Sequence, residues 1–300
     1  MSTAPSVFIL GAGPVAMALA GALATRGQPP VGLWARRAKA AKRAGEFAGI
    51  PHAAGDWPQA LRDADVIVFA VSDDSIASLA NRLAADGVLS GTQVLLHCAG
   101  SRAAGTVFSN MPARGVGLLH PLRAIASAAE TLADIASTTF GIEGDTAGRA
   151  AAEQIAAALG ASVLALEAHQ LAAYHAAAAI ASNYLVSVLD LAEDVLAQAG
   201  IEGSAAREAF ADLAQGALDN VRQTGLPKAL TGPIRRGDVA TVRAHAEALA
   251  AGPGENLELY RSLGRRCLVL SQKCGDAEAE KLTEIASLLA EPARADPPEG

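Results

Sequence analysis

The sequence predicts an α/β protein in two parts: a doubly wound domain with a parallel sheet over residues 1–165, then an all-helical domain over residues 166–291. Three observations support this prediction. Short apolar runs alternate with helical stretches as far as residue 166, strand signals stop after Glu167, and a glycine-rich turn follows the first apolar run. Residues 292–300 hold three prolines and no core residue, so we expect a flexible tail there.

The predicted strands are short runs rich in apolar and β-branched residues. Runs of this kind, without polar alternation, are typical of strands that are buried on both faces of a parallel sheet. The predicted strands are Val7–Leu10, Val31–Ala35, Val66–Val71, Gln93–His97, Val116–Leu119, Thr138–Ile142 and Val163–Leu166.

Helical spacing of apolar residues is clearest between these strands in Val15–Thr25, Ser75–Ala85 and Ala147–Leu159. After Glu167 only helical patterns follow, and glycine and proline separate them. They cover Ala168–Gln198, Ala205–Gln223, Val239–Ala250, Asn256–Lys273 and Ala277–Ala290. The change of pattern near residue 165 therefore predicts a domain boundary without a flexible linker.

Composition narrows the class of protein. The 300 residues are 51% hydrophobic and 18% charged, which excludes an intrinsically disordered chain. A net charge of −7 argues against a nucleic-acid-binding protein that neutralises phosphates. Residues 1–165 carry 12 basic and 12 acidic side chains, so the acidic excess belongs to the helical part. Five of those 12 bases fall within residues 36–43, which calls for an explanation.

Three features bear on localisation. The three cysteines are an odd number without metal-like spacing, so we expect a reduced, cytoplasmic protein with no metal site. No Lys or Arg precedes the apolar stretch Val7–Ala24, and a glycine turn interrupts it, so we do not expect a secretory signal. The stretch Gln170–Leu189 has no formal charge but contains polar residues, among them Gln170, His175, Ser182 and Asn183; we expect a buried helix, not a membrane span.

A dinucleotide-binding turn is predicted where the first strand meets the first helix. The segment Gly11-Ala12-Gly13-Pro14-Val15-Ala16 has the pattern G-x-G-x-x-A. In this pattern Gly11 allows the tight turn, Gly13 lets the backbone approach a pyrophosphate, and Ala16 lets helix and strand pack closely. The free N–H groups of the helix N-terminus also favour phosphate. The alternative is a purely structural strand–helix turn.

The residues after the second strand indicate which dinucleotide binds. NAD-binding proteins normally carry Asp or Glu here for the ribose 2′-hydroxyl, whereas this chain has Arg36 and Arg37, followed by Lys39, Lys42 and Arg43. A guanidinium can form a bidentate pair with a 2′-phosphate, so we predict NADP(H) rather than NAD(H). The alternative is a solvated basic helix face, which suits Lys39 and Lys42.

Polar residues follow the next predicted strands. Ligands bind beyond the carboxyl ends of strands in such sheets, so we expect Val71 and Ser72 to border the nicotinamide half of the cofactor. Ser101 and His120 follow the next two strands, and we expect them to contact the substrate in the same crevice. A structural histidine is the alternative for His120.

His97 and Cys98 lie close to Ser101 in the sequence, at the end of the same predicted strand. The role of His97 is left open between a site residue and a structural histidine. Cys98 is expected to be a small buried residue rather than a nucleophile, because only its nearness to His97 in the sequence suggests a base.

The sharpest catalytic candidate lies in the alanine-rich helix that opens the second domain. His175, Ser182 and Asn183 fall on one helical stripe, at i, i+7 and i+8. Histidine can deliver a proton near neutral pH, so we expect His175 to act as general acid or base, with Ser182 and Asn183 orienting it or binding substrate. A His–Asn hydrogen bond that stabilises helix packing is the alternative. The alanines between them leave room for a cofactor or a partner helix.

Four segments together resemble a known family. The glycine turn, His120-Pro121-Leu122, Tyr174-His175 with Ser182-Asn183, and Leu230-Thr231-Gly232-Pro233 with Arg236-Gly237-Asp238 are similar to Rossmann-like proteins with a C-terminal domain of unknown function 2520. The architecture is similar to 6-phosphogluconate dehydrogenase, ketopantoate reductase and pyrroline-5-carboxylate reductase. The resemblance implies an NADP-dependent oxidoreductase with its site between a Rossmann domain and a helical domain that often dimerises.

One departure from these relatives concerns the catalytic helix. The hydroxyacid dehydrogenase and ketopantoate reductase relatives use a Lys with an Asn four residues later. Here His175 takes the corresponding place, Ala179 stands four residues later, and Asn183 follows one turn on. The substrate and mechanism of those relatives therefore do not transfer directly. In the Leu230–Asp238 loop we favour a structural ion pair between Arg236 and Asp238 over the alternative, which is substrate binding.

The sequence thus favours an oxidoreductase that transfers a hydride between NADP(H) and a small carbonyl, imine or hydroxy compound at the interdomain cleft. A sensor or scaffold that binds NADP(H) without turnover is the alternative, because fold alone does not prove catalysis. A hydride exchanger that uses a deazaflavin is a third hypothesis. We expect a small-molecule substrate, no nucleic acid or membrane partner, and a homodimer formed through the helical domain.

Overall fold

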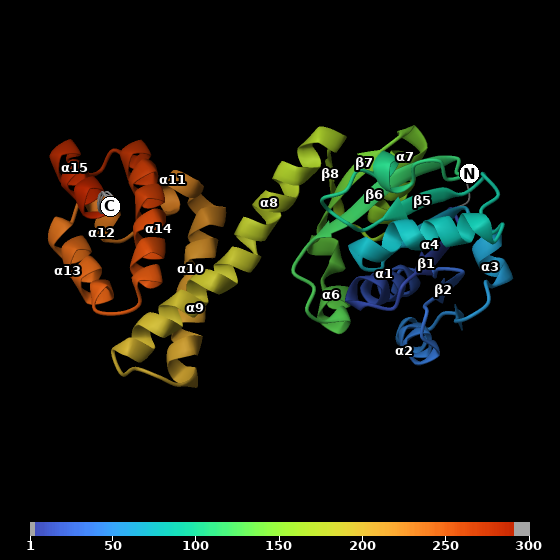
Figure 1. Ribbon diagram of the computed structural model, residues 1–300, viewed down its shortest axis with the longest axis horizontal. Coiled ribbons are helices and arrows are strands. Elements are labelled where there is room, and N and C mark those ends of the chain that lie inside the picture. The colour runs from blue at the N-terminus through green and yellow to red at the C-terminus, as the bar shows by residue number, and fades with distance from the viewer. Residues whose placement is uncertain (1–3, 291–300) are drawn as a thin grey trace, which may run out of the picture. The chain divides into compact units, whose positions relative to one another are not determined.

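The computed structural model describes residues 4–290 and divides the chain into two compact units. The division falls between Ser182 and Asn183, while the last strand ends earlier, at Ala165. The first unit contains every strand of the described chain, and the second is built of helices (Figure 1). The predicted tail over residues 292–300 lies outside the described residues.

The first unit is built on an eight-stranded sheet with the order β3-β2-β1-β4-β5-β6-β7-β8. All neighbouring strands are parallel except β6 and β7, which are antiparallel. In chain order the strands are β1 (Val7–Leu10), β2 (Gly32–Trp34), β3 (His52–Ala53), β4 (Val66–Phe69), β5 (Val94–His97), β6 (Gly115–Leu122), β7 (Thr139–Gly144) and β8 (Ser162–Ala165).

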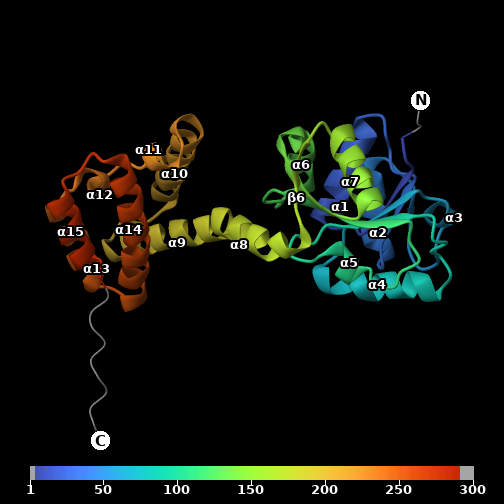
Figure 2. The ribbon, with the colours of Figure 1, turned by 90° about the horizontal axis from the view of Figure 1, so that it is seen from above.

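Helices cover both faces of this sheet, with α1 and α7 on one side and α4 and α5 on the other (Figure 2). The doubly wound fold predicted from the sequence is confirmed. The helices of this unit are α1 (Pro14–Thr25), α2 (Ala38–Ala48), α3 (Gln59–Arg62), α4 (Asp73–Ala85), α5 (Ala104–Val107), α6 (Ala128–Ala133), α7 (Thr146–Ala158) and α8 (Leu171–Ala181), with short 3-10 turns at Ile135–Ser137 and Ala168–Gln170.

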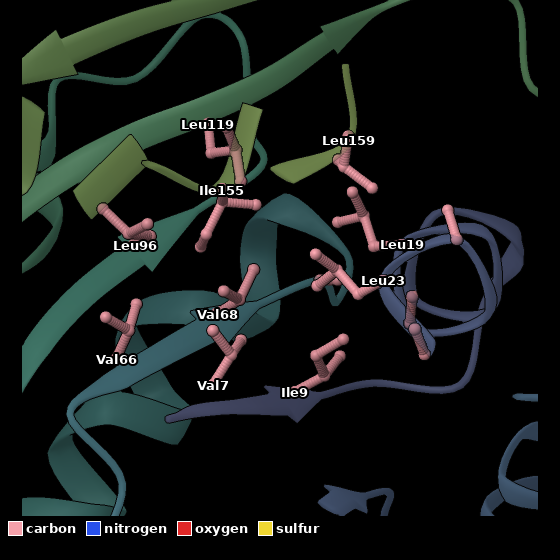
Figure 3. Close-up of a cluster of buried hydrophobic side chains, with 14 of the residues drawn as sticks. Val7, Ile9, Leu19, Leu23, Val66, Val68, Leu96, Leu119, Ile155 and Leu159 are labelled. Carbon is pink, nitrogen blue, oxygen red and sulfur yellow. The ribbon is translucent and has the colours of Figure 1, made fainter. Parts of the chain in front are cut away.

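Strand β1 shows why the sheet has two cores. All four of its side chains are buried, and they alternate between the two faces because successive residues of a strand point in opposite directions. Val7 and Ile9 join the core under α1 and α7, where Figure 3 shows them with Val66 and Val68 of β4. Phe8 and Leu10 join the second core, on the side of α4.

Two features of the sheet were not predicted. Strand β3 was missed because it is only two residues long, which is too short for a periodic signal. Strand β7 was placed correctly, but its reversed direction relative to β6 cannot be inferred from its apolar composition. The reversal sets His120 of β6, a predicted site residue, opposite Gly141 of β7.

The second unit consists of helices around a smaller core. Leu268 of one long helix packs there with Leu282 and Ile285 of the last helix. The helices are α9 (Asn183–Gln198), α10 (Ser204–Thr224), α11 (Leu226–Ala229), α12 (Pro233–Arg236), α13 (Val239–Ala250), α14 (Gly254–Cys274) and α15 (Ala279–Leu288). The predicted helices agree with these boundaries to within two residues, except that one of them is interrupted.

The interrupted helix is the apolar one predicted over Ala168–Gln198. It breaks at Ser182, whose backbone angles are φ −120° and ψ −71°. Among the described residues, this helical stretch is the one that is long and apolar enough to cross a membrane. Only 6% of its most apolar 18 residues is buried. The expectation of a buried helix is therefore wrong for the single chain. A soluble core helix and a membrane helix both pass such a test, so the finding is weak evidence for a span.

Candidate functional site

The glycine turn has the geometry that the sequence predicted. Gly11 has φ +132°, a conformation that side chains disfavour, and a Cβ there would collide with the carbonyl oxygen of Ala70. Gly13 precedes the first residue of α1, and no heavy atom outside Gly13 and its two chain neighbours lies within 4 Å of where its Cβ would be. The backbone at Gly13 is therefore open to a close-approaching ligand. Ala16, by contrast, is fully buried and packs beneath the turn.

A cavity of about 750 Å³ opens beside this turn, within the first unit. It brings together eight of the nine residues predicted to bind the cofactor, and Ala16 is the exception. The eight are Gly11, Gly13, Pro14, Val15, Arg36, Arg37, Val71 and Ser72. Segments from the ends of β1, β2 and β4 therefore meet at one cavity, as expected for the carboxyl edge of a parallel sheet.

Four arginines line this cavity: Arg36, Arg37, Arg43 and Arg82. Asp73 is the one acidic residue among the lining residues, so the lining carries an excess of positive charge. Arg43 also donates a hydrogen bond to the carbonyl oxygen of Ala12, at 3.4 Å, and thereby links α2 to the glycine turn. Lys42 pairs instead with Glu46 at the exposed surface. Sequence reasoning assigned no cofactor role to Arg43 or Arg82.

The loop after β5 leads from this cavity to a cluster of aromatic polar residues. Cys98 lines the cavity, and burial, aided by the nearby charge of Asp73, raises the pKa of its thiol to about 12. The thiol is therefore protonated at neutral pH and is a poor nucleophile. Two residues further on, Gly100 lies against the ring of His120, where a Cβ would come within 2.8 Å of the imidazole.

His97 is a fully buried histidine at the start of that loop. Its Nδ1 accepts a hydrogen bond from the backbone N–H of Ala99 at 3.2 Å, while its Nε2 has no hydrogen-bond partner. Burial, with smaller contributions from Arg102 and His120, lowers the pKa of His97 to about 4. His97 is thus neutral at pH 7 and holds the loop in place from the core.

His120 lies in a hydrogen-bonded pair with Tyr174 of α8. The Tyr174 hydroxyl is 2.8 Å from Nδ1 of His120, and the two rings meet edge-on. Burial first, and then the charge of His175, lowers the pKa of His120 to about 4, while burial raises the pKa of Tyr174 to about 12. Both members of the pair are therefore neutral at pH 7. Tyr174 was not predicted to be a site residue, because its sequence context alone does not indicate its partner.

His175 is exposed on α8, and its ring centre lies 6.0 Å from that of His120. Ser101, the other predicted substrate contact, is exposed in the turn after β5, next to Gly100. Three predicted site residues of the first unit thus come from the turn after β5 (Ser101), from β6 (His120) and from α8 (His175). The predicted boundary near residue 165 assigns His175 to the second domain, whereas the compact first unit includes it.

The stripe predicted for His175, Ser182 and Asn183 does not form on one continuous helix. Regular helical geometry ends at Ala181, and Asn183 begins α9, which belongs to the second unit. Spacings of seven and eight residues keep side chains on one face only while the helix is unbroken, so the geometric argument for this trio fails. Functional roles for Ser182 and Asn183 stay predictions.

The Leu230–Asp238 loop is held by structural contacts that differ from the predicted one. Asp238 caps α13 by accepting hydrogen bonds from the backbone N–H and the hydroxyl of Thr241. The ion pair in this region joins Arg235 to Asp276 at 2.7 Å, and Arg235 also donates to the carbonyl oxygens of Lys228 and Leu230. The predicted pairing of Arg236 with Asp238 is therefore replaced by a helix cap, although the structural role itself was anticipated.

Comparisons with known families agree with this arrangement. Residues 6–96 match the family model described as NADP oxidoreductase coenzyme F420-dependent, and residues 138–267 match the model of a domain of unknown function (DUF2520). Together the two matches confirm the predicted resemblance to Rossmann-like proteins with a DUF2520 domain. No curated protein gives a significant match to its sequence.

Solved structures share the fold of this chain at low sequence identity. A Bacteroides fragilis protein provisionally described as an NADP oxidoreductase is 22% identical, with a TM-score of 0.68 over 88% of this chain and 97% of that one. A reductive aminase from Aspergillus terreus, in complex with NADPH and ethyl-5-oxohexanoate, is 17% identical (TM-score 0.62; 93% and 98% covered). The NADP-bound pyrroline carboxylate reductase of Plasmodium falciparum is 12% identical (TM-score 0.59; 95% and 98% covered).

Proposed function

We propose that this protein is an oxidoreductase that transfers a hydride between NADP(H) and a small carbonyl, imine or hydroxy compound. One observation carries the proposal: the cavity at the glycine turn is lined by four arginines, and β2 is followed by Arg36 and Arg37 instead of an acidic residue. Two solved neighbours of the same fold hold NADP or NADPH. One is named a pyrroline carboxylate reductase, and the other is a reductive aminase in complex with a keto ester, which supports the substrate class.

The residues of the cavity fit a dinucleotide with a 2′-phosphate. The open backbone at Gly13 and the free N–H groups of the first turn of α1, including that of Val15, would hold the pyrophosphate. The guanidinium groups of Arg36 and Arg37 would bind the 2′-phosphate, for which a fork of N–H donors is well suited. Val71 and Ser72 would border the nicotinamide half, at the end of β4.

Bound NADPH would supply the hydride, and the chain would supply orientation and a proton. In our proposal His175 gives the proton to the substrate atom that gains negative charge, and Ser101 and His120 contact the substrate. Ser182 and Asn183 are proposed to orient His175 or the substrate, and the interdomain location of the site is part of the proposal. A neutral His120, fixed by Tyr174, would take part by hydrogen bonding and not as an imidazolium.

Two further parts of the proposal concern assembly and location. Tyr184 and Val186 of α9 are 60% and 68% exposed in the single chain. A second copy of the chain would bury these apolar groups, so we propose a homodimer formed through α9 of the helical unit. We also propose a cytoplasmic location, since Cys98, Cys267 and Cys274 are unpaired.

The proposed function is tested by incubating the purified protein with NADPH and a panel of keto acids, aldehydes and cyclic imines. Loss of NADPH absorbance that depends on one of these compounds is the expected result. NADPH binding without turnover of any of them would favour the sensor or scaffold instead. The description of the family model that matches residues 6–96 also favours including a deazaflavin in the panel, and exclusive reduction of that compound would replace the proposed substrate class.

A further inference from the structure

Three side chains at one wall of the cavity form a stack. The ring centres of Trp34 and Trp57 are 4.6 Å apart with the planes tilted by 41°, and the guanidinium carbon of Arg82 lies 4.7 Å from the ring centre of Trp57. Trp34 and Arg82 both line the cavity. This Trp34–Trp57–Arg82 stack joins the end of β2 to α4 across the loop that carries Trp57.

A second set of contacts fixes the stack. Asp86 accepts a hydrogen bond from the indole N–H of Trp57 at 2.7 Å, and the same carboxylate oxygen lies 3.6 Å from Nε of Arg82. The Arg82 side chain is 55% exposed, so one face of its guanidinium lies on Trp57 while much of the rest is uncovered. A planar cation held in this way needs little further ordering to bind a flat ligand.

Helix α4 directs Arg82 toward the cavity. Ser75, Ser78, Leu79 and Arg82 are the residues of α4 beyond its first two positions that line it. Their spacing of i, i+3, i+4 and i+7 places them on one helical face, with Leu79 providing apolar surface next to Arg82. Gly11 of the glycine turn lies against Ala70, three residues before α4 begins, so this turn is at the other end of the face.

We propose that Arg82 is the adenine-binding residue of this cavity, with its guanidinium stacked on the base and Leu79 beside it. This inference rests on the proposed NADP(H) binding. Adenine is the part of the cofactor joined to the ribose that carries the 2′-phosphate, and Trp34 directly precedes the segment that holds Arg36 and Arg37. Asp86 already lies near the Arg82 charge, which favours a neutral base over a phosphate as its partner.

The arginines of this cavity would then have two different tasks. Arg36 and Arg37 would select NADP(H) over NAD(H), because only the former carries the phosphate that they bind. Arg82 would raise the affinity for both dinucleotides equally, because both carry adenine. The two tasks are separable by measuring dissociation constants for NADPH, NADH and adenosine 2′,5′-bisphosphate, the last of which contains adenine and the 2′-phosphate without nicotinamide.

The test compares the wild type with Arg82→Ala, Arg82→Lys and a control, Arg222→Ala. Arg222 is also an exposed, ion-paired arginine on a helix, but it belongs to α10 of the other unit. Titration calorimetry gives the affinities, and the emission of Trp34 and Trp57 gives a second readout, because they are the two tryptophans of the chain. Circular dichroism verifies that each variant is folded.

We expect Arg82→Ala to weaken all three ligands by the same factor, roughly 5- to 30-fold, as for loss of one stacking partner of a base. Arg82→Lys keeps the charge but loses the plane, so it should resemble Arg82→Ala, while Arg222→Ala should bind like the wild type. Wild-type affinity in Arg82→Lys, a loss confined to the two ligands with a 2′-phosphate, or no loss in Arg82→Ala would each overturn the inference. If the wild type binds none of the three ligands, the proposed function itself fails.

Discussion

The hydroxyl of Tyr174 lies 2.8 Å from Nδ1 of His120, although the two residues are 54 positions apart in the sequence. Two glycines make the contact possible. Gly141 lies below the phenol, where a Cβ would come within 2.6 Å of the hydroxyl, and Gly100 lies against the imidazole. The pair is therefore built by the close approach of two backbones to two rings, and not by the side chains alone.

Gly141→Ala should disturb this pair by steric conflict. We expect it to lower the free energy of unfolding by about 1–3 kcal/mol, as for overpacking of a well-packed site. Tyr174→Phe removes the atom closest to the new methyl group, so the double variant should recover part of the loss. Chemical denaturation of all four proteins checks this, and strictly additive effects would contradict the proposed conflict.

Arg36→Asp should change cofactor selectivity. It removes a charge-assisted hydrogen bond to the 2′-phosphate and adds a repelling charge, so we expect NADPH affinity to fall roughly 10- to 100-fold more than NADH affinity. Fluorescence titration of both cofactors measures the difference. Lys42→Asp is the matched control, because it makes the same change of charge in the same basic run without lining the cavity. Equal losses of both cofactors in Arg36→Asp would refute the phosphate role.

His175→Ala should separate chemistry from cofactor binding. Loss of a positioned acid or base costs on the order of 10²–10⁴ in rate, so kcat should fall by that factor with a substrate from the panel, while NADPH affinity stays close to the wild-type value. His169→Ala is the control, since His169 is also exposed and lies six residues earlier. A variant that keeps the wild-type kcat would exclude His175 as the proton donor.

Most of the fold could be predicted, because the spacing of apolar residues and the glycines that separate helices can be read from short stretches of sequence. The cofactor cavity was predictable for a similar reason, since a parallel sheet brings the ends of its strands to one edge. The partnership of His120 and Tyr174 was not, because it depends on the antiparallel pairing of β6 with β7 and on the entry angle of α8. The break at Ser182 also escaped prediction, because an apolar, alanine-rich sequence gives no sign of an interruption.

His97 should make the first unit sensitive to acid. Its pKa of about 4 in the folded protein is below the unfolded value of 6.5, so its contribution to stability is complete above pH 6.5 and is lost as the pH falls toward 4. Between pH 7 and pH 5 this loss is about 2 kcal/mol for His97.

His97→Gln keeps an acceptor for the Ala99 N–H but does not titrate, so its stability should fall less between these two pH values. Urea unfolding followed by the emission of Trp34 and Trp57 reports on this unit alone, because both residues belong to it. His169→Gln, which removes an exposed histidine, should keep the wild-type pH dependence. An unchanged pH dependence in His97→Gln would show that His97 does not carry the effect.

Val186→Glu should prevent the proposed dimer. Val186 is 68% exposed on α9, and a carboxylate at the centre of an apolar interface has a high desolvation cost. Sedimentation velocity at micromolar concentration should give a dimer for the wild type and a monomer for the variant. Ala240→Glu, on the exposed side of α13, should stay dimeric. A wild-type monomer would refute the dimer outright.

The single reversal in the sheet has a consequence for how this protein tolerates change. His120 faces Gly141 only because β6 and β7 pair in one particular register. A slip of one residue would bring Phe140 or Ile142 opposite the imidazole, and a bulky side chain would then occupy the space that the phenol needs. Insertions in the connection over residues 123–138 leave this register intact, whereas one residue added within either strand would dismantle the pair while the sheet survives.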